Sequence, residues 1–287
     1  TQAIRVGMER THEREHSEPI YATSSFVFPN AETMCDAFVN NSGLSTYARI
    51  DNPTVDGFCK RLAVMENTES CEATASGMGA ILSTVIAYCR SGDRILVSTG
   101  VFGATMILFQ KYFAKLGIKI DIVPTRDLKA WEKALEKRPK LAYCETPSNP
   151  TIEVIDICSL SEMCRQIGCL LVVDNCFMTP ALQRPLELGA DLVIHSATKY
   201  LDGQGRVLGG AVLGSKALVE PITAFIRSGG VTMSAFNAWI FLKGLETLEL
   251  RMKVHSEHAL KLALWLQAQP QVALVNYAGL KTHPQAG

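Results

Sequence analysis

Two residues of this 287-residue sequence, Asp174 and Lys199, each follow a short apolar run and are positioned to do chemistry. The apolar run 170–173 leads to Asp174, and the run 192–194 leads through Ser196 and Thr198 to Lys199. Such runs are typical of buried parallel strands, and open α/β sheets bind ligands beyond the carboxyl ends of their strands. A lysine amine and an aspartate placed there suit pyridoxal 5'-phosphate. The lysine would form a Schiff base with the cofactor, and the aspartate would pair with its protonated ring nitrogen.

A second interpretation of this pair needs no cofactor. A single buried aspartate or a lysine near a strand end is more often part of a structural ion pair or of a solvated rim. The choice therefore depends on the rest of the sequence.

The composition favours a globular protein that acts on small molecules. Hydrophobic residues make up 47% of the chain and charged residues 20%, which is enough to bury a large core. Lysine and arginine together number 28, and so do aspartate and glutamate, so the formal net charge is zero. Because no excess positive charge would attract nucleic acid or an anionic membrane, we expect neither as a partner.

The cysteine pattern points to reduced thiols and not to a disulfide framework or a zinc site. The nine cysteines lie between Cys35 and Cys176, and none is in a C-x-x-C motif. The pair His255 and His258 has no cysteine nearby, so we expect no metal. The N-terminus lacks an apolar signal core and no run reaches transmembrane length, which predicts a cytoplasmic protein.

The middle of the chain alternates between strand and helix patterns. Strands are predicted at residues 94–98, 118–123, 141–145, 170–174 and 192–195, and helices at residues 80–88, 106–116, 128–137, 160–167 and 181–188. This alternation predicts right-handed βαβ crossovers and a mostly parallel sheet flanked by helices. Asn52 is a good N-cap for a helix that starts at Pro53, and one long helix is predicted over residues 234–267.

Two glycine-containing stretches border the predicted sheet. The stretch 73–80 is rich in small residues and contains Ser76, Gly77 and Met78; it predicts a turn before a helix, where backbone N–H groups bind phosphate well. Alone this signal is weak, because glycine before a helix is more often only a tight turn. The stretch 203–214 is interpreted as flexible backbone or a close-packed strand beside the site.

Taken together, these motifs resemble the fold-type I, Cys/Met-metabolism family of pyridoxal-phosphate enzymes. The resemblance extends over nearly the whole chain, and the stretches that match are Tyr47–Arg49, Asn52–Thr54, Ala75–Met78, Glu145–Pro150, Val173–Asn175 and Ser196–Tyr200. The resemblance implies an α/β fold with a mostly parallel sheet of seven strands. It also implies an N-terminal arm (1–52), a large cofactor-binding domain (53–256), and the start of a C-terminal α+β substrate domain (257–287) whose remainder this sequence does not contain.

The resemblance also implies roles that spacing cannot show. Tyr47 and Arg49 would reach the cofactor phosphate of a neighbouring subunit, so a homodimer would be the minimal active unit and a homotetramer the usual assembly. Asn149 would lie near the cofactor hydroxyl and the substrate carboxylate. Phe102 would stack on the ring. The arginine that holds the substrate carboxylate would belong to the part of the C-terminal domain that this sequence does not contain.

Within the family, Phe102 and the stretch 200–210 resemble the O-succinylhomoserine sulfhydrylases. The resemblance implies an amino-acid substrate and sulfide as partners, with homocysteine and succinate as products of a γ-replacement in methionine biosynthesis. A cystathionine γ-synthase or a γ-lyase of the same family is an alternative. A dinucleotide-dependent oxidoreductase is disfavoured by the missing G-x-G-x-x-G motif, and a catalytically silent oligomeric scaffold is another class.

Overall fold

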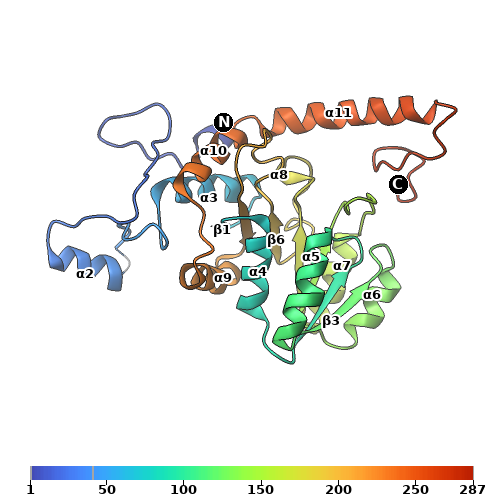
Figure 1. The fold of residues 1–287 in the computed structure, drawn as a ribbon, viewed down its shortest axis with the longest axis horizontal. Coiled ribbons are helices and arrows are strands. Elements are labelled where there is room, and N and C mark those ends of the chain that lie inside the picture. Colours follow the sequence, from blue (N-terminus) through green and yellow to red (C-terminus); the bar gives the residue numbers. More distant parts are fainter. Residues whose placement is uncertain (1, 41, 287) are drawn as a thin grey trace. The chain divides into compact units, whose positions relative to one another are not determined.

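The computed structural model describes residues 2–40 and 42–286 as an α/β protein (Figure 1). It contains seven strands, in the sheet order β1-β7-β6-β5-β4-β2-β3. The strands are β1 (Ser70–Thr74), β2 (Arg94–Ser98), β3 (Lys119–Val123), β4 (Leu141–Glu145), β5 (Leu170–Asp174), β6 (Leu192–His195) and β7 (Gly210–Gly214). The pair β1–β7 is antiparallel, whereas β3, β2, β4, β5 and β6 run parallel. The predicted fold class, a mostly parallel seven-stranded sheet with helices, is confirmed.

The chain divides into two compact units. The first comprises Thr1–Ser83 and Ser196–Glu246, and the second comprises Thr84–His195 and Thr247–Gly287. Helices of the first unit are α1 (Gln2–Arg5), α2 (Ala31–Val39), α3 (Pro53–Met65), α9 (Lys216–Gly229) and α10 (Ala235–Leu245), and α4 (Gly77–Tyr88) begins in it. The predicted division into arm, large domain and C-terminal domain is a separate proposal that this division does not test.

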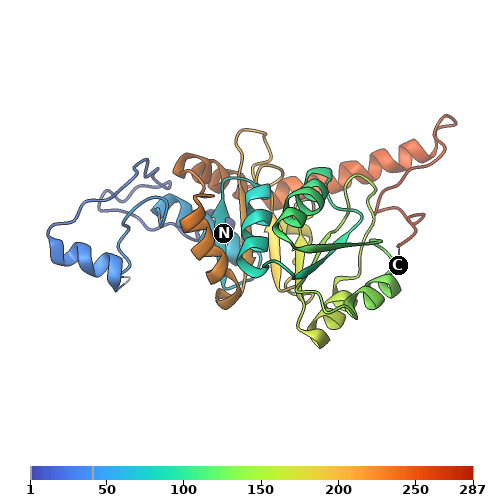
Figure 2. The same cartoon turned by 60° about the horizontal axis from the view of Figure 1, so that its bottom comes forward.

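The second unit surrounds the parallel strands with helices on both sides (Figure 2). The helices of this unit are α5 (Gly103–Ile107), the π-helical η1 (Leu108–Phe113), the 3₁₀-helical η2 (Ala114–Leu116), α6 (Leu128–Leu135), α7 (Ile157–Ile167), α8 (Thr179–Leu182) and α11 (Leu248–Gln267), which extends away from the strands. Alternate strand residues point to opposite faces. Leu96, Cys144 and Val173 therefore share a core with Trp131 of α6 and Leu160 of α7.

The opposite face of these strands is covered by the stretch from α5 to η2. The Phe109 and Tyr143 ring centroids lie 5.3 Å apart, and both side chains are buried. The stretch ends at Gly117, whose φ of 79° is the left-handed conformation that glycine adopts without steric cost. Gly168 ends α7 in the same way.

Helix α3 begins where its capping residues predict. The Asn52 side chain accepts a hydrogen bond from the Thr54 N–H, and Pro53 occupies the first helical position. The Asn52 amide nitrogen also donates to the Tyr21 carbonyl oxygen at 2.9 Å. The Thr54 hydroxyl donates to the Pro19 carbonyl oxygen at 3.1 Å. The start of α3 therefore holds the preceding extended segment.

Two predicted helices are wrong in extent. The helix predicted over residues 181–188 is limited to Thr179–Leu182, because Pro185 lacks an N–H and disfavours a helical conformation in the residue before it. The long helix predicted over 234–267 is instead two helices, α10 and α11, separated at Glu246 and Thr247. Thr247 leaves the helical conformation with φ −116° and ψ 7°.

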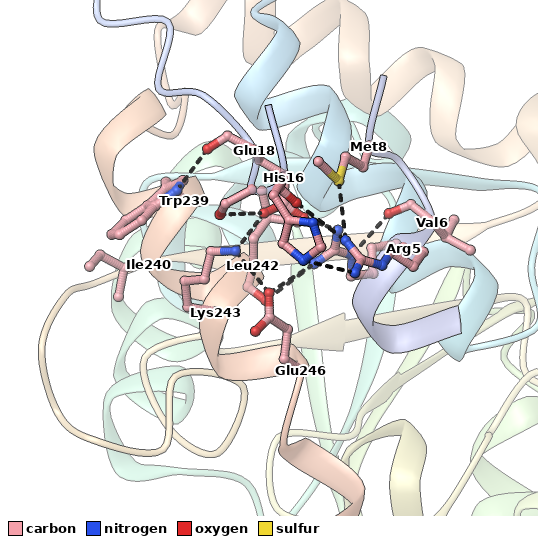
Figure 3. A network of polar contacts seen from close by, with 12 residues as sticks. Arg5, Val6, Met8, His16, Glu18, Trp239, Ile240, Leu242, Lys243 and Glu246 are labelled. Carbon is pink, nitrogen blue, oxygen red and sulfur yellow. Dashed lines mark hydrogen bonds and ion pairs between the residues drawn. The ribbon is translucent and has the colours of Figure 1, made fainter. Parts of the chain in front are cut away.

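A buried ionic network connects the N-terminal segment to α3 and α10 within the first unit (Figure 3). The Arg61 side chain is fully buried and pairs with Glu18, which also pairs with Lys243. Arg61 Nε donates to the Val6 carbonyl oxygen at 2.9 Å, and Trp239 Nε1 donates to the Glu18 carbonyl oxygen at 3.0 Å. These contacts hold Val6 and Glu18, which belong to the predicted N-terminal arm (1–52), on their own unit. The predicted contact of this arm with a neighbouring subunit stays a prediction.

Burial alone would raise the pKa of Glu18, but hydrogen bonds from Lys243 and Arg61 outweigh it and hold the pKa at about 2. A carboxyl group with a lowered pKa in the folded state stabilises the fold above its ordinary pKa, which is 4.5 here. That contribution is lost as the pH falls from 4.5 towards 2. The network is therefore sensitive to acid.

We predict that Glu18→Gln lowers the free energy of unfolding by about 3 kcal/mol at neutral pH, because it leaves a buried arginine without its counter-charge. Urea unfolding at several pH values is the measurement, and the difference from the wild type should shrink below pH 4.5. Glu9→Gln is the control: the Glu9–Lys60 pair is exposed, so the expected loss is less than about 1 kcal/mol. Equal losses in the two variants would contradict the assigned role of burial.

Candidate active site

The parallel strands of the second unit end in register at one edge. Glu145 on β4 pairs with Asp174 on β5, and Asp174 pairs with Ile194 on β6. Directly paired residues on neighbouring strands point to the same face. Two carboxyl groups therefore meet at the carboxyl end of this sheet, the edge where the sequence analysis placed the site.

Asp174 is buried, with 8% of its surface exposed. Its Oδ2 accepts a hydrogen bond from the Tyr143 hydroxyl at 2.8 Å, and its Oδ1 accepts one from the Cys176 N–H at 3.1 Å. Burial raises the pKa of Asp174, while these two hydrogen bonds and the nearby His195 oppose the rise. Each oxygen keeps one lone pair available, so the carboxylate can still accept a hydrogen bond from a cationic ligand.

Phe102 follows β2 and is held by the other carboxyl group. Its backbone N–H donates to Glu145 Oε2 at 2.7 Å, while its side chain is 49% exposed. Burial, and secondarily the charge of Asp174, raise the pKa of Glu145 to about 8. The arrangement fixes the Phe102 backbone at the edge of the sheet and leaves its ring accessible.

Asn149 lies in the loop that follows β4 and is partly buried. Its N–H donates to the Gly100 carbonyl oxygen at 3.2 Å, which ties this loop to the loop that carries Phe102. Ser148 N–H donates to the Glu153 carbonyl oxygen at 2.8 Å and closes the Asn149 loop. Three predicted site residues, Phe102, Asn149 and Asp174, are thus positioned by the ends of β2, β4 and β5.

The remaining predicted residues belong to the first unit. Helix α4 begins at Gly77, and the Ser76 hydroxyl accepts a hydrogen bond from the Gly79 N–H at 3.1 Å. A Cβ added to Gly77 would lie 2.7 Å from Cβ of Ser196. One added to Gly210 would lie 2.4 Å from the Ser76 carbonyl oxygen. The turn at residues 76–78 therefore packs directly against Ser196 and β7. This close packing requires glycine at positions 77 and 210.

The loop after β6 carries Lys199. Thr198 Oγ1 lies 3.1 Å from the Gly209 N and 3.2 Å from the Gly209 carbonyl oxygen, which anchors the loop. The Lys199 N–H donates to the Ser196 carbonyl oxygen, and its own carbonyl oxygen accepts from the Gly203 N–H at 2.8 Å. The backbone of Lys199 is thus fixed while its side chain is exposed.

Tyr47 and Arg49 lie on a turn of the first unit. The Tyr47 side chain is 41% exposed, and the Arg49 guanidinium lies 5.5 Å from the centre of its ring. Arg49 donates a hydrogen bond to the Arg227 carbonyl oxygen. Their predicted contact with a neighbouring subunit's cofactor stays a prediction.

Sequence reasoning missed the site residues Tyr143 and Glu145. In the sequence, Glu145 stands out only as the first residue of the matching stretch Glu145–Pro150. A signal was present, because a tyrosine and a glutamate alternate on one face at the end of an otherwise apolar strand, and a charged residue is rarely buried without a partner. Only the register with β5 shows that both side chains face Asp174.

The residue types and the packing fit pyridoxal phosphate. Residues 76–78 form the turn at the N-terminus of a twelve-residue helix, a suitable place for a phosphate. Asp174 supplies a buried carboxylate for a protonated ring nitrogen, and Lys199 supplies an exposed amine on a fixed backbone.

The described part of the chain holds no group of three or more His, Cys, Asp or Glu side chains arranged for a metal ion. Among residues 2–40 and 42–286, no helix has both the length and the apolar character needed to cross a membrane.

Comparison with known proteins agrees with this class of site. The model of the Cys/Met metabolism PLP-dependent enzyme family matches residues 1–287. The chain is 52% identical over 285 residues to an O-succinylhomoserine sulfhydrylase of Pseudomonas aeruginosa, covering 99% of the chain and 71% of that protein. It is 40% identical over 288 residues to an L-methionine gamma-lyase of Pseudomonas putida, covering 99% and 72%.

Solved structures agree as well. A cystathionine gamma synthase from Xanthomonas oryzae pv. oryzae, 35% identical, superposes with a TM-score of 0.92 over 99% of this chain and 72% of that one. The fold is therefore that of the fold-type I pyridoxal-phosphate enzymes. The chain belongs to the Cys/Met metabolism family of PLP-dependent enzymes, and its cofactor is pyridoxal 5'-phosphate.

We predict that Gly77→Ala weakens cofactor binding at least tenfold, because the new Cβ would force the phosphate turn away from Ser196. Gly77 does not need a positive φ, so the effect is purely steric. Fluorescence titration of the apoprotein with pyridoxal phosphate is the measurement. Gly103→Ala is the matched control, since nothing lies within 4 Å of its added Cβ. Wild-type affinity in Gly77→Ala would refute the phosphate assignment.

Proposed function

We propose that this protein is an O-succinylhomoserine sulfhydrylase, a transferase that converts O-succinylhomoserine and sulfide to homocysteine and succinate in methionine biosynthesis. The Cγ–O bond to succinate breaks and a Cγ–S bond forms, without net oxidation or reduction. The observation that carries the proposal is Phe102, whose accessible ring at the sheet edge bears no hydroxyl. The 52% identity with a protein of that name supports it.

The proposal assigns each predicted residue a role in holding the cofactor. Ser76, Gly77 and Met78, with Ser196 and Thr198, would bind the phosphate. Asp174 would bind the ring nitrogen, Phe102 would stack on the ring, and Asn149 would lie beside the ring hydroxyl. Tyr47 and Arg49 would reach the phosphate of a neighbouring subunit, which makes a homodimer the minimal active unit and a homotetramer the expected assembly in the cytoplasm.

Lys199 would carry most of the proton transfer. When bound, pyridoxal phosphate supplies an electron-withdrawing ring that stabilises negative charge on the substrate's α-carbon. The Lys199 amine, exposed on a fixed backbone, would accept the α-proton and return protons to the product. Asp174 would keep the ring nitrogen protonated. Phe102 would exclude water from one face without exchanging a proton, since a phenyl ring has no acidic hydrogen.

A second candidate function within the family is cystathionine γ-synthesis or γ-elimination. It is favoured by the 35% identity with a cystathionine gamma synthase structure and the 40% identity with an L-methionine gamma-lyase. These reactions share the proposed cofactor residues and differ in the nucleophile or in the leaving group. A catalytically silent scaffold is the alternative of another class, and it would not need an accessible lysine.

We predict that borohydride reduction of the cofactor-loaded protein fixes the cofactor on Lys199. Its amine is exposed and its backbone is held between Ser196 and Gly203. Peptide mapping after reduction is the measurement, with Lys199→Ala as the control that should take up no stable label. Label on a different lysine would remove Lys199 from the proposed chemistry.

We also predict that sulfide is preferred to cysteine as the nucleophile with O-succinylhomoserine. A cysteine-using enzyme must bind a second ammonium and carboxylate, and those contacts provide discrimination that a sulfide-using enzyme does not need. The measurement compares kcat/KM for homocysteine and for cystathionine formation, with an expected ratio of about ten or more in favour of homocysteine. Faster cystathionine formation would replace the proposed activity with the synthase and leave the roles of Lys199 and Asp174 intact.

A further inference from the structure

Strand β4 contributes two buried polar side chains to the sheet edge. Tyr143 and Glu145 are separated by one residue, so both point to the same face. In the register with β5, Tyr143 pairs with Val172 and Glu145 pairs with Asp174. The phenol and both carboxyl groups therefore lie on one face, in a region where each is at least 90% buried.

The Tyr143 side chain is held in position by packing, and its hydroxyl donates a hydrogen bond to a carboxyl group. Tyr143 is 1% exposed, and its ring packs against Phe109. Its hydroxyl donates to Asp174 Oδ2 at 2.8 Å, although the Glu145 carboxyl lies on the same strand face. Burial raises the pKa of Tyr143 well above its ordinary value, and the charges of Asp174 and Glu145 add to the rise. The phenol therefore stays protonated and keeps donating.

It is energetically unfavourable for two neighbouring buried carboxyl groups both to carry a negative charge. Asp174 receives hydrogen bonds from Tyr143 and Cys176, and the charge of His195 also favours its ionised form, whereas Glu145 receives the Phe102 N–H. Burial and the charge of Asp174 raise the pKa of Glu145 to about 8. Glu145 is therefore the carboxyl group that favours the protonated form at neutral pH, and Asp174, which accepts two hydrogen bonds, is the better holder of the negative charge.

We propose that Tyr143 is a positioning residue of the cofactor site: its hydrogen bond keeps the negative charge of the carboxyl pair on Asp174, opposite the protonated ring nitrogen. The inference rests on the proposed role of Asp174. Without the phenol hydroxyl, Asp174 and Glu145 compete more evenly for the proton. A protonated Asp174 has no charge to offer the ring nitrogen.

The test is Tyr143→Phe, which keeps the ring packed against Phe109 and removes only the hydroxyl. We expect cofactor affinity to fall about tenfold, which corresponds to about 1.4 kcal/mol. We also expect the pKa of the bound cofactor's ring nitrogen to be about one unit lower in the variant than in the wild type. ¹⁵N NMR of ring-labelled pyridoxal phosphate bound to the protein measures this pKa. Tyr112→Phe is the matched control, because Tyr112 is 51% exposed. It should leave both measurements unchanged.

A second variant separates positioning from damage to the fold. In Tyr143→Phe/Glu145→Gln the competing carboxyl is gone, so the charge returns to Asp174 and both affinity and ring-nitrogen titration should move back towards the wild type. A merely structural role would give no rescue.

The outcomes distinguish this inference from the proposed function. Unchanged titration in Tyr143→Phe, or no rescue in the double variant, overturns the inference while cofactor attachment at Lys199 stands. Failure of the wild-type protein to take up cofactor at Lys199 overturns the proposed function, and this inference with it.

Discussion

Asp174 is the carboxylate around which the rest of the site is arranged, because a buried negative charge is costly unless it is paired and hydrogen-bonded. In this protein the neighbouring strands meet that requirement. Strand β4 supplies the Tyr143 hydroxyl in register, and the backbone just beyond β5 supplies the Cys176 N–H. The polar edge thus depends on the parallel register of β4, β5 and β6, which in turn depends on the apolar packing of the sheet. A slip of one residue would turn Asp174 to the opposite face.

Most residues assigned to the site lie in the loops that follow the strands, and these loops are also held by hydrogen bonds. Each parallel strand of the second unit has only four or five residues, and Asp174 is the last residue of β5, whereas Phe102, Asn149 and Thr198 lie in loops beyond strand ends. Phe102 is held by Glu145, Asn149 by Gly100, and Thr198 by Gly209. Side chains on loops are mobile unless the backbone is bonded at such points. A rigid sheet edge with anchored loops provides the preorganisation that catalysis requires.

The sequence predicted most of the parallel sheet. Four strands, 94–98, 141–145, 170–174 and 192–195, were predicted with the observed bounds, because each is an apolar run that ends abruptly. Strand β1 was missed because its sequence is largely polar, and β7 was only suggested because it begins and ends in glycine. Their antiparallel pairing is a long-range contact that no local pattern carries. For the same reason the hydrogen bond between Tyr143 and Asp174, 31 residues apart, was invisible in the sequence.

The fold and the cofactor are shared by relatives that carry different names, so neither can define the reaction. The difference must come from side chains beside the substrate, including those that also contact the cofactor. Under the proposed function Phe102 would be such a residue: its backbone is fixed by Glu145, so the position of its ring is set by the sheet edge and its chemistry by the absent hydroxyl. A tyrosine on the same backbone would place an acid–base group beside the substrate. Under the proposed function, a phenylalanine would leave that work to Lys199, and a small nucleophile that needs few directing contacts, such as sulfide, would suit a site of this kind.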